Sequence, residues 1–336
     1  MKELRVGVVG VGYLGRFHAE KYARMDGVKL AGVVDIITER AQNVAKRLGT
    51  ESFTDYRDLI GEVDAVSVVV PTPLHFSISR DFLENNVDVL IEKPITETLE
   101  EADALIKIAD SRGPIIQVGH LERFNPAVIA LREVVDRPLF IESHRLSVFK
   151  ERGTEVDVVL DLMIHDIDII LSFVRSELKS IHAAGVPVIS SCVDVANVRL
   201  VFENGCVANI TASRISLKNM RKIRIFQKDT YVSVDYANHE ITIVRKDGKG
   251  TELPIPGMSL QRTSFEKADS LESELEAFVR SVRNREAPLV SGRDGRNALR
   301  VALSIMDQIE ETNKRFLGKK GFRDSGIQGF RDSGIF

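Results

Sequence analysis

The chain has only two cysteines, Cys192 and Cys206, among its 336 residues. They could form one disulfide at most, which excludes a disulfide-stapled fold, and so low a cysteine content suits a reducing compartment. Long hydrophobic runs are missing as well. The apolar run at residues 6–11 is too short for a secretory signal, and no stretch approaches the roughly 20 apolar residues of a membrane-spanning helix. We therefore predict a soluble, cytoplasmic protein.

An excess of charge of one sign is also absent. The 46 Lys and Arg residues nearly balance the 49 Asp and Glu residues, which leaves a formal charge of -3. Such a chain has no general field that attracts nucleic acid or an anionic membrane, so we expect neither as a partner. With 43% hydrophobic residues, the chain is long enough for about two packed domains of roughly 150 residues each.

The first part of the chain alternates short runs rich in Val and Ile with segments of helical periodicity. This alternation is typical of βαβ units, and the hydrophobicity of the runs indicates a sheet covered by helices on both faces. Strands are expected at residues 4–9, 28–34, 64–70, 87–92 and 115–119. Thr38 is expected to cap a helix that stops at Gly49, and a later helix covers 99–109. The predicted fold class is α/β, with a doubly wound Rossmann domain at residues 1–122.

Residues 123–318 have the pattern of a second, α+β domain with an open, mainly antiparallel sheet. Asn204 and Gly205 separate two alternating runs and predict a hairpin, because both residues tolerate a positive φ. Asp247-Gly248 predicts a similar turn. Helices are expected at residues 156–174, 271–283 and 296–311.

The tail, residues 319–336, repeats itself. The same seven residues, Gly-Phe-Arg-Asp-Ser-Gly-Ile, occupy 321–327 and 329–335. Two copies are too few for a solenoid, so we predict a frayed or partner-dependent extension.

Three glycines, Gly10, Gly12 and Gly15, directly follow the first predicted strand and open a helix. In a dinucleotide-binding loop, the first allows a tight turn, the second lets the backbone approach a pyrophosphate, and the third lets helix and strand pack closely. Asp35 ends the second strand, where a carboxylate accepts hydrogen bonds from ribose hydroxyls and repels a 2′-phosphate. We therefore predict NAD as the cofactor, although Arg40 leaves NADP open.

Other polar residues follow later strands of the predicted sheet, and ligands bind at this carboxyl edge. The segments concerned are 71–75, which contains Thr72 and His75, then Glu92-Lys93-Pro94, and Gly119-His120. Lys93 precedes a proline that restricts its backbone, so it could stabilise charge on a reacting oxygen. The alternative is a solvated surface lysine.

One face of the predicted helix at residues 156–174 carries four polar residues, spaced four, four and three apart: Asp157, Asp161, His165 and Asp168. Three interpretations are open. The carboxylates and the histidine could hold a metal, His165 could be a structural residue paired with Asp161, or His165 could be a general base. We favour the base, because oxidation of an alcohol needs a proton acceptor with a pKa near neutrality.

Over residues 3–315 the chain resembles the Gfo/Idh/MocA oxidoreductase family. The matching features are the glycine loop extended to His18, the 71–75 segment, Glu92-Lys93-Pro94, Gly119 with Arg123-Phe124, and the Asp161-x-x-x-His165 pair. The resemblance implies a Rossmann domain and a second domain whose open sheet usually forms a dimer interface, hence a homodimer or homotetramer.

The resemblance also implies residue roles. Lys93 would hydrogen-bond the reacting hydroxyl, His165 would remove its proton, and Asp161 would orient the substrate; no metal is required. The residues implied to bind NAD are Gly10, Gly12, Tyr13, Leu14, Gly15, Asp35, Thr72, His75, Glu92, Lys93 and Gly119.

Two segments, 118–128 and 161–168, are similar to a group within this family that oxidises carbon 3 of UDP-N-acetylglucosamine. The product of that group is a 3-keto nucleotide sugar, which an aminotransferase converts to a diamino sugar used in lipid A biosynthesis. Two alternatives remain: a dehydrogenase of a free polyol or monosaccharide such as inositol or glucose, and a non-catalytic nucleotide-binding regulator.

A diphosphate substrate needs cations. The second domain supplies Arg145, Arg152, Arg214, Lys218, Arg221 and Lys222. These residues either bind the diphosphate or form a solvated basic edge. The residues predicted to bind the substrate are Lys93, Arg123, Asn125, Asp161, His165, Arg214 and Lys218, although Arg123 could instead pair with Glu122 or a helix end.

Overall fold

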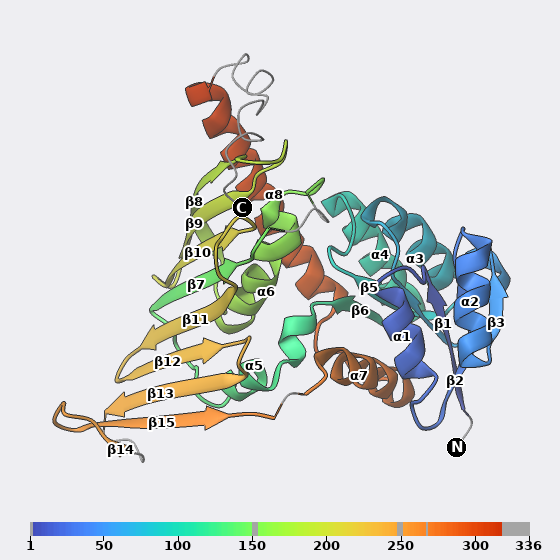
Figure 1. Ribbon diagram of the computed structural model, residues 1–336, viewed down its shortest axis with the longest axis horizontal. Helices are drawn as coiled ribbons and strands as arrows, with labels where there is room; N and C mark the ends of the chain where they lie inside the picture. Colours follow the sequence, from blue (N-terminus) through green and yellow to red (C-terminus); the bar gives the residue numbers. More distant parts are fainter. Residues whose placement is uncertain (1–2, 150–153, 247–250, 267, 318–336) are drawn as a thin grey trace, which may run out of the picture.

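The computed structural model describes residues 3–149, 154–246, 251–266 and 268–317 and contains two sheets (Figure 1). The first sheet is parallel, with strand order β3-β2-β1-β4-β5-β6. Its strands are β1 (Leu4–Val9), β2 (Val28–Val34), β3 (Glu51–Phe53), β4 (Ala65–Val68), β5 (Asp88–Glu92) and β6 (Ile116–Gly119). The predicted Rossmann sheet is confirmed. Only β3 was not foreseen, because three residues without a Val or Ile run carry no strand signal.

Helices cover this sheet, as its hydrophobic strands require. They are α1 (Gly15–Tyr22), α2 (Thr38–Leu48), α3 (His75–Glu84) and α4 (Leu99–Arg112), with short 3-10 turns η1 (Tyr56–Leu59) and η2 (Thr72–Leu74). Gly49 ends α2 with φ +68°, as expected, but the prediction that Thr38 caps α2 was wrong. Ile37 occupies the cap and no side chain bonds there.

The second sheet has nine strands in the order β14-β15-β13-β12-β11-β7-β10-β9-β8. They are β7 (Phe140–Leu146), β8 (Leu178–Val186), β9 (Val195–Phe202), β10 (Val207–Ser213), β11 (Met220–Gln227), β12 (Thr230–Asp235), β13 (Glu240–Lys246), β14 (Thr251–Glu252) and β15 (Met258–Ser264). All neighbours are antiparallel except β7 and β10. The hairpin at Gly205 is confirmed, with φ +86°. The predicted turn at 247–248 and the repeated tail lie outside the described residues.

One face of the second sheet packs against helices (Figure 1). These elements are η3 (Leu121–Phe124), α5 (Pro126–Leu131), η4 (Val159–Met163), α6 (Ile164–Phe173) and α8 (Gly292–Leu317). The helix predicted at 156–174 is observed over residues 159–173, so it is slightly shorter than expected. Its first turn, η4, is a π-helix. Such wide turns are common at functional sites.

Helix α7 (Ser270–Asn284) returns from the second sheet to the first. Its residues Leu275, Phe278 and Val282 share one core with Val6 of β1 and Tyr22 of α1. Helix α8 then contacts both α4 and α6. The end of the chain thus packs against both domains and fixes how the two sheets lie relative to each other.

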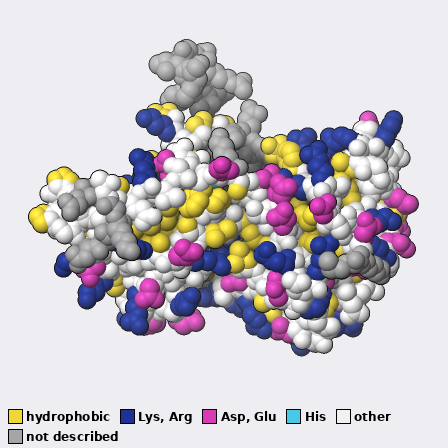
Figure 2. Space-filling model, turned by 90° about the horizontal axis from the view of Figure 1, so that it is seen from below, with side chains coloured by type: hydrophobic (Ala, Val, Ile, Leu, Met, Phe, Trp, Pro, Cys, Tyr) yellow, Lys and Arg dark blue, Asp and Glu magenta, His cyan; other side chains and the backbone are white. Residues whose placement is uncertain are grey.

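The surface agrees with the balanced composition. In Figure 2, basic and acidic side chains are interspersed over the face that is seen from below. Among the described residues, none of the helices combines the length and the apolar character needed to cross a bilayer.

Candidate active site

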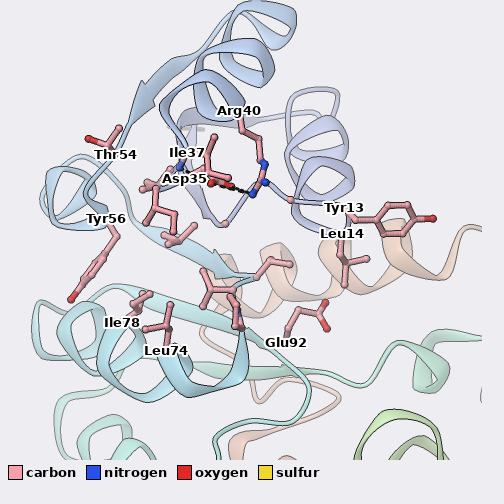
Figure 3. A pocket seen from close by; sticks show the side chains of 18 of the residues that line it. Tyr13, Leu14, Asp35, Ile37, Arg40, Thr54, Tyr56, Leu74, Ile78 and Glu92 are labelled. Carbon is pink, nitrogen blue, oxygen red and sulfur yellow. Dashed lines mark hydrogen bonds and ion pairs between the residues drawn. The ribbon is translucent and has the colours of Figure 1, made fainter. Parts of the chain in front are cut away.

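A cavity of about 590 Å³ lies at the carboxyl edge of the parallel sheet (Figure 3). Loops that follow β1, β2, β4 and β5 line it. Seven of the residues predicted to bind the cofactor are in this lining: Gly10, Gly12, Tyr13, Leu14, Asp35, Glu92 and Lys93. The size suits a cofactor site, since ligand pockets typically span about 300–1,000 Å³.

The glycine loop has the geometry that a dinucleotide requires. Gly10 has φ +86°, and a Cβ there would lie 2.3 Å from the carbonyl oxygen of Val69. A Cβ on Gly15 would lie 1.8 Å from the Gly10 oxygen, so this glycine allows α1 to pack against β1. At Gly12 the nearest atom to an added Cβ is 3.9 Å away, so this backbone faces open space where a diphosphate could approach.

Asp35 is buried and held in place from three directions. Its carboxylate accepts hydrogen bonds from the backbone N–H of Val11 (3.2 Å) and of Ile37 (3.0 Å). Arg40 Nη1 donates to both carboxylate oxygens, at 3.3 and 3.2 Å (Figure 3). The carboxylate is thus fixed at the cavity wall, where it can accept hydrogen bonds from ribose hydroxyls. It also pairs with Arg40, the residue that kept NADP as an alternative cofactor.

The remaining predicted cofactor residues, Gly15, Thr72, His75 and Gly119, are not part of the cavity lining. His75 lies between two backbone oxygens, with Nδ1 2.9 Å from Pro94 and Nε2 2.8 Å from Val70. Burial lowers its pKa, and the side chain joins the loops after β4 and β5. A Cβ on Gly119 would meet the Glu92 carboxylate at 3.0 Å, so this glycine makes room for Glu92.

Lys93 connects the two domains. Its Nζ donates to the backbone oxygen of Asp161 at 2.7 Å and lies 3.6 Å from the carboxylate Oδ1 of the same residue. Only 19% of the Lys93 side chain is exposed, which overturns the alternative of a solvated surface lysine. Burial lowers its pKa, while the charges of Asp161 and Glu92 act in the opposite direction.

His165 follows Asp161 by one helical turn. Its ring meets that of His120 edge-on, with the ring centroids 6.2 Å apart. Burial, together with the positive charges of Lys93 and Arg145, lowers the pKa of His165 well below its ordinary value of 6.5. The imidazole is therefore neutral at neutral pH and has a nitrogen able to accept a proton, although its pKa lies below the near-neutral value expected of the base.

The other two residues of the predicted polar face, Asp157 and Asp168, make contacts elsewhere in the second domain. Asp157 accepts a hydrogen bond from the backbone N–H of Val193 at 2.6 Å. Asp168 is buried, and its Oδ1 lies 3.6 Å from Nη1 of Arg123. The described residues contain no group of three His, Cys, Asp or Glu that could hold a metal ion, so the metal interpretation gains no support.

Three of the residues predicted to bind substrate donate hydrogen bonds to backbone oxygens of the protein itself. Arg123 donates to the carbonyl oxygens of Asp168 and Leu289. Asn125 caps α5 through the N–H of Ala127 and donates to Tyr236. Arg214 is buried, donates to the carbonyl oxygen of Val156, and lies 3.9 Å from Asp194. Lys218 is exposed in the loop before β11, and Arg152 lies outside the described residues.

A buried charge network behind His165 was not foreseen. Arg145 Nε lies 2.6 Å from Asp166, and its Nη1 lies 2.8 Å from Glu122. These carboxylates outweigh the effect of burial and raise the pKa of Arg145. The sequence does hold a signal for it, because Ser143 and Arg145 occupy the helix-facing positions of β7, where apolar residues are the rule.

Fold and site together define a two-domain dehydrogenase of the nicotinamide dinucleotide class. Residues 4–120 match the Gfo/Idh/MocA oxidoreductase family, in its domain described as an NAD-binding Rossmann fold, and residues 137–231 match the C-terminal domain of that family. The chain belongs to this family and is an NAD-dependent oxidoreductase.

Individual relatives agree. The chain is 40% identical to UDP-N-acetylglucosamine 3-dehydrogenase of Acidithiobacillus ferrooxidans, over 92% of this chain and 98% of the relative. A solved structure of that enzyme matches with a TM-score of 0.88 and covers 93% of this chain and 99% of its own. Myo-inositol 2-dehydrogenase of Thermotoga maritima is 27% identical, over 92% of this chain and 97% of the relative.

Proposed function

We propose that this enzyme oxidises a ring hydroxyl of a sugar, carbon 3 of UDP-N-acetylglucosamine, to a ketone. The observation that carries the proposal is the contact of Lys93, which lines the dinucleotide cavity, with Asp161 of the second domain, one helical turn before His165. The choice of substrate is supported by the relative that is 40% identical over nearly its whole length.

Oxidation of the hydroxyl removes a proton from the oxygen and a hydride from the carbon, and different groups would take each. His165, neutral at neutral pH, takes the hydroxyl proton, and Lys93 stabilises the negative charge that develops on the oxygen. Asp161 holds the Lys93 ammonium at the cleft. The nicotinamide of bound NAD supplies the hydride acceptor. Because the catalytic groups come from both domains, the fixed packing of α7 and α8 contributes by holding them at reacting distance.

A free polyol such as inositol is the second candidate substrate. The Thermotoga maritima relative, a myo-inositol 2-dehydrogenase, covers almost the same length at lower identity. A non-catalytic regulator is the weaker alternative, since it would not need a buried lysine beside a neutral histidine.

We also propose the assembly and the metabolic setting. The face of the second sheet that lacks helices in Figure 1 would join two copies in a homodimer, or four in a homotetramer. A downstream aminotransferase would convert the ketone to an amine. Both reactions are placed in the cytoplasm.

A substrate panel tests the function. The purified chain is incubated with NAD and, separately, UDP-N-acetylglucosamine, N-acetylglucosamine, glucose or myo-inositol, and absorbance near 340 nm is followed. We expect NADH formation with the nucleotide sugar, and mass spectrometry should find a product two hydrogens lighter. Turnover of inositol or free sugars, with none of the nucleotide sugar, contradicts the proposal.

A further inference from the structure

The position of Arg221 follows from strand register. Strands β7 and β11 are antiparallel neighbours, and Arg221 lies directly opposite Arg145. Cross-strand partners point to the same face of a sheet. Arg145 reaches Asp166 on α6, so Arg221 also faces the helices, on the same side as the buried Ile223. It therefore stands on the side of the sheet that carries the catalytic histidine.

The strand register places two neighbouring cations, Lys222 and Arg224, on the opposite face of the sheet. Side chains alternate along a strand, so Lys222 points to the opposite, helix-free face, where it lies across from His144. Arg224 lies on that same face and pairs with Glu142 at 3.3 Å. Neither side chain points toward the helices that pack on the other face.

Arg221 and Arg145 differ in how their charge is used. Arg145 is buried and compensated by two close carboxylates, at 2.6 and 2.8 Å. Arg221 shares only the second of these, Glu122, at a longer distance of 3.6 Å, and 57% of its side chain is exposed. Glu122 is thus already committed to Arg145, and most of the Arg221 guanidinium remains open to solvent.

The charge of Arg221 is also felt at the catalytic base. After burial and the charges of Lys93, Arg145 and His120, Arg221 is one of the groups that lower the pKa of His165. Its guanidinium shares the Glu122 carboxylate with Arg145, which places it at the edge of the same charge network. The backbone oxygen of Arg221 accepts a hydrogen bond from Tyr236 at 2.9 Å, which fixes this end of β11.

We propose that Arg221 binds the phosphate groups of the substrate and thereby selects nucleotide sugars over free sugars. The inference rests on the proposed function and deepens it. In the nucleotide sugar the diphosphate is attached at carbon 1 of the same ring whose carbon 3 hydroxyl reacts, so a cation on the side of the sheet that carries His165, but outside the reacting pair, is suitably placed. Arginine suits the role because its planar fork can donate two parallel hydrogen bonds to a phosphate.

Among the residues first considered for this role, Arg221 is the strongest in the described structure. Arg214 is buried and engaged with Val156 and Asp194, and Arg145 is compensated. Lys218 is exposed in the adjoining loop and could assist. Of the six cations named for the diphosphate, Arg221 is therefore the one on which we centre the phosphate site.

The test compares Arg221→Gln with Arg224→Gln, a matched control three residues along the same strand but on the other face. With UDP-N-acetylglucosamine, R221Q should lose about 10- to 100-fold in kcat/KM, chiefly through KM, since charged hydrogen bonds contribute about 1.5–3 kcal/mol. R224Q should match the wild type, and Arg221→Lys should recover part of the loss. An unchanged KM in R221Q refutes the role of Arg221 while leaving the proposed function intact.

A binding measurement separates the proposed function from the proposed role of Arg221. Calorimetry with UDP as the probe, on the NAD-loaded enzyme, should show binding to the wild type and to R224Q and at least 10-fold weaker binding to R221Q. If the wild type oxidises only free sugars, the proposed function fails and the selective role of Arg221 fails with it, whether or not UDP binds. If the wild type oxidises the nucleotide sugar but R221Q binds UDP as tightly as the wild type, only this inference fails. If the wild type does not bind UDP, the inference is overturned.

Discussion

Glu274 of α7 offers a sharp test of the electrostatics beneath the active site. It is fully buried, and neither carboxyl oxygen has a hydrogen-bond partner in the described structure. Burial, reinforced by the charge of Glu92, raises its pKa well above the ordinary 4.5. Burial also acts to raise the pKa of Glu92, but its contact with His18 and the charge of Lys93 outweigh this and lower it. The pKa values of these two carboxyl groups are thus shifted in opposite directions, so the ionised form is favoured at Glu92 and the protonated form at Glu274.

The consequence for stability has a definite sign. Because the folded pKa of Glu274 exceeds the unfolded one, its contribution is fully present below pH 4.5 and is lost as the pH rises through the folded pKa. Each pH unit over which only the unfolded state ionises costs about 1.4 kcal/mol. Glu274→Gln mimics the protonated acid, so the mutant should gain stability relative to the wild type as the pH rises above 4.5, by at most about 1.4 kcal/mol per pH unit.

Urea unfolding of both proteins at pH 5, 6 and 7 measures this difference. Glu276→Gln, at an exposed position on the same helix, controls for the loss of one carboxylate and should show no such trend. A difference between E274Q and wild type that stays flat with pH, or that shrinks as the pH rises, would refute the assignment of the proton to Glu274.

Three further predictions concern catalysis and the cofactor. His165→Asn should reduce kcat by about 100- to 10,000-fold without changing the dissociation constant for NAD. In the wild type, the fall of kcat at acid pH should be centred below pH 6.5, because burial and the charge of Lys93 lower the pKa of His165. A fall centred above pH 6.5 would exclude this histidine as the base. Lys93→Met should lower kcat and move the acid limb of the residual activity to higher pH, since one of the charges that depress the histidine pKa is gone; an unmoved limb would show that the two groups are not coupled. Asp35→Ser should weaken NAD binding and relax discrimination against NADP, because Arg40 loses its carboxylate partner and becomes able to pair with a 2′-phosphate; binding titrations with both cofactors measure this, and an unchanged preference would remove Asp35 from its role.

Much of the first domain could be read from local pattern. Strand positions agreed to within two residues, and the glycine loop with Asp35 lies in the cavity as expected. These signals are short in range, because a βαβ unit and its phosphate loop depend on the periodicity and turn chemistry of neighbouring residues. The pairing of β7 with β11, about 80 residues apart along the chain, has no such local signal.

What the sequence by itself determined, then, was the Rossmann fold and the NAD cofactor, and it singled out Lys93 and His165 as candidates for the reactive groups. The tertiary structure alone decided which charged side chains are paired within the protein and which are open to solvent: Lys93 contacts Asp161, Arg214 donates to a backbone oxygen, and most of the Arg221 side chain is exposed. The physical reason is that the environment of a charge depends on burial and on partners from distant segments, such as the 68 residues between Lys93 and Asp161. Residue type and spacing do not encode those contacts.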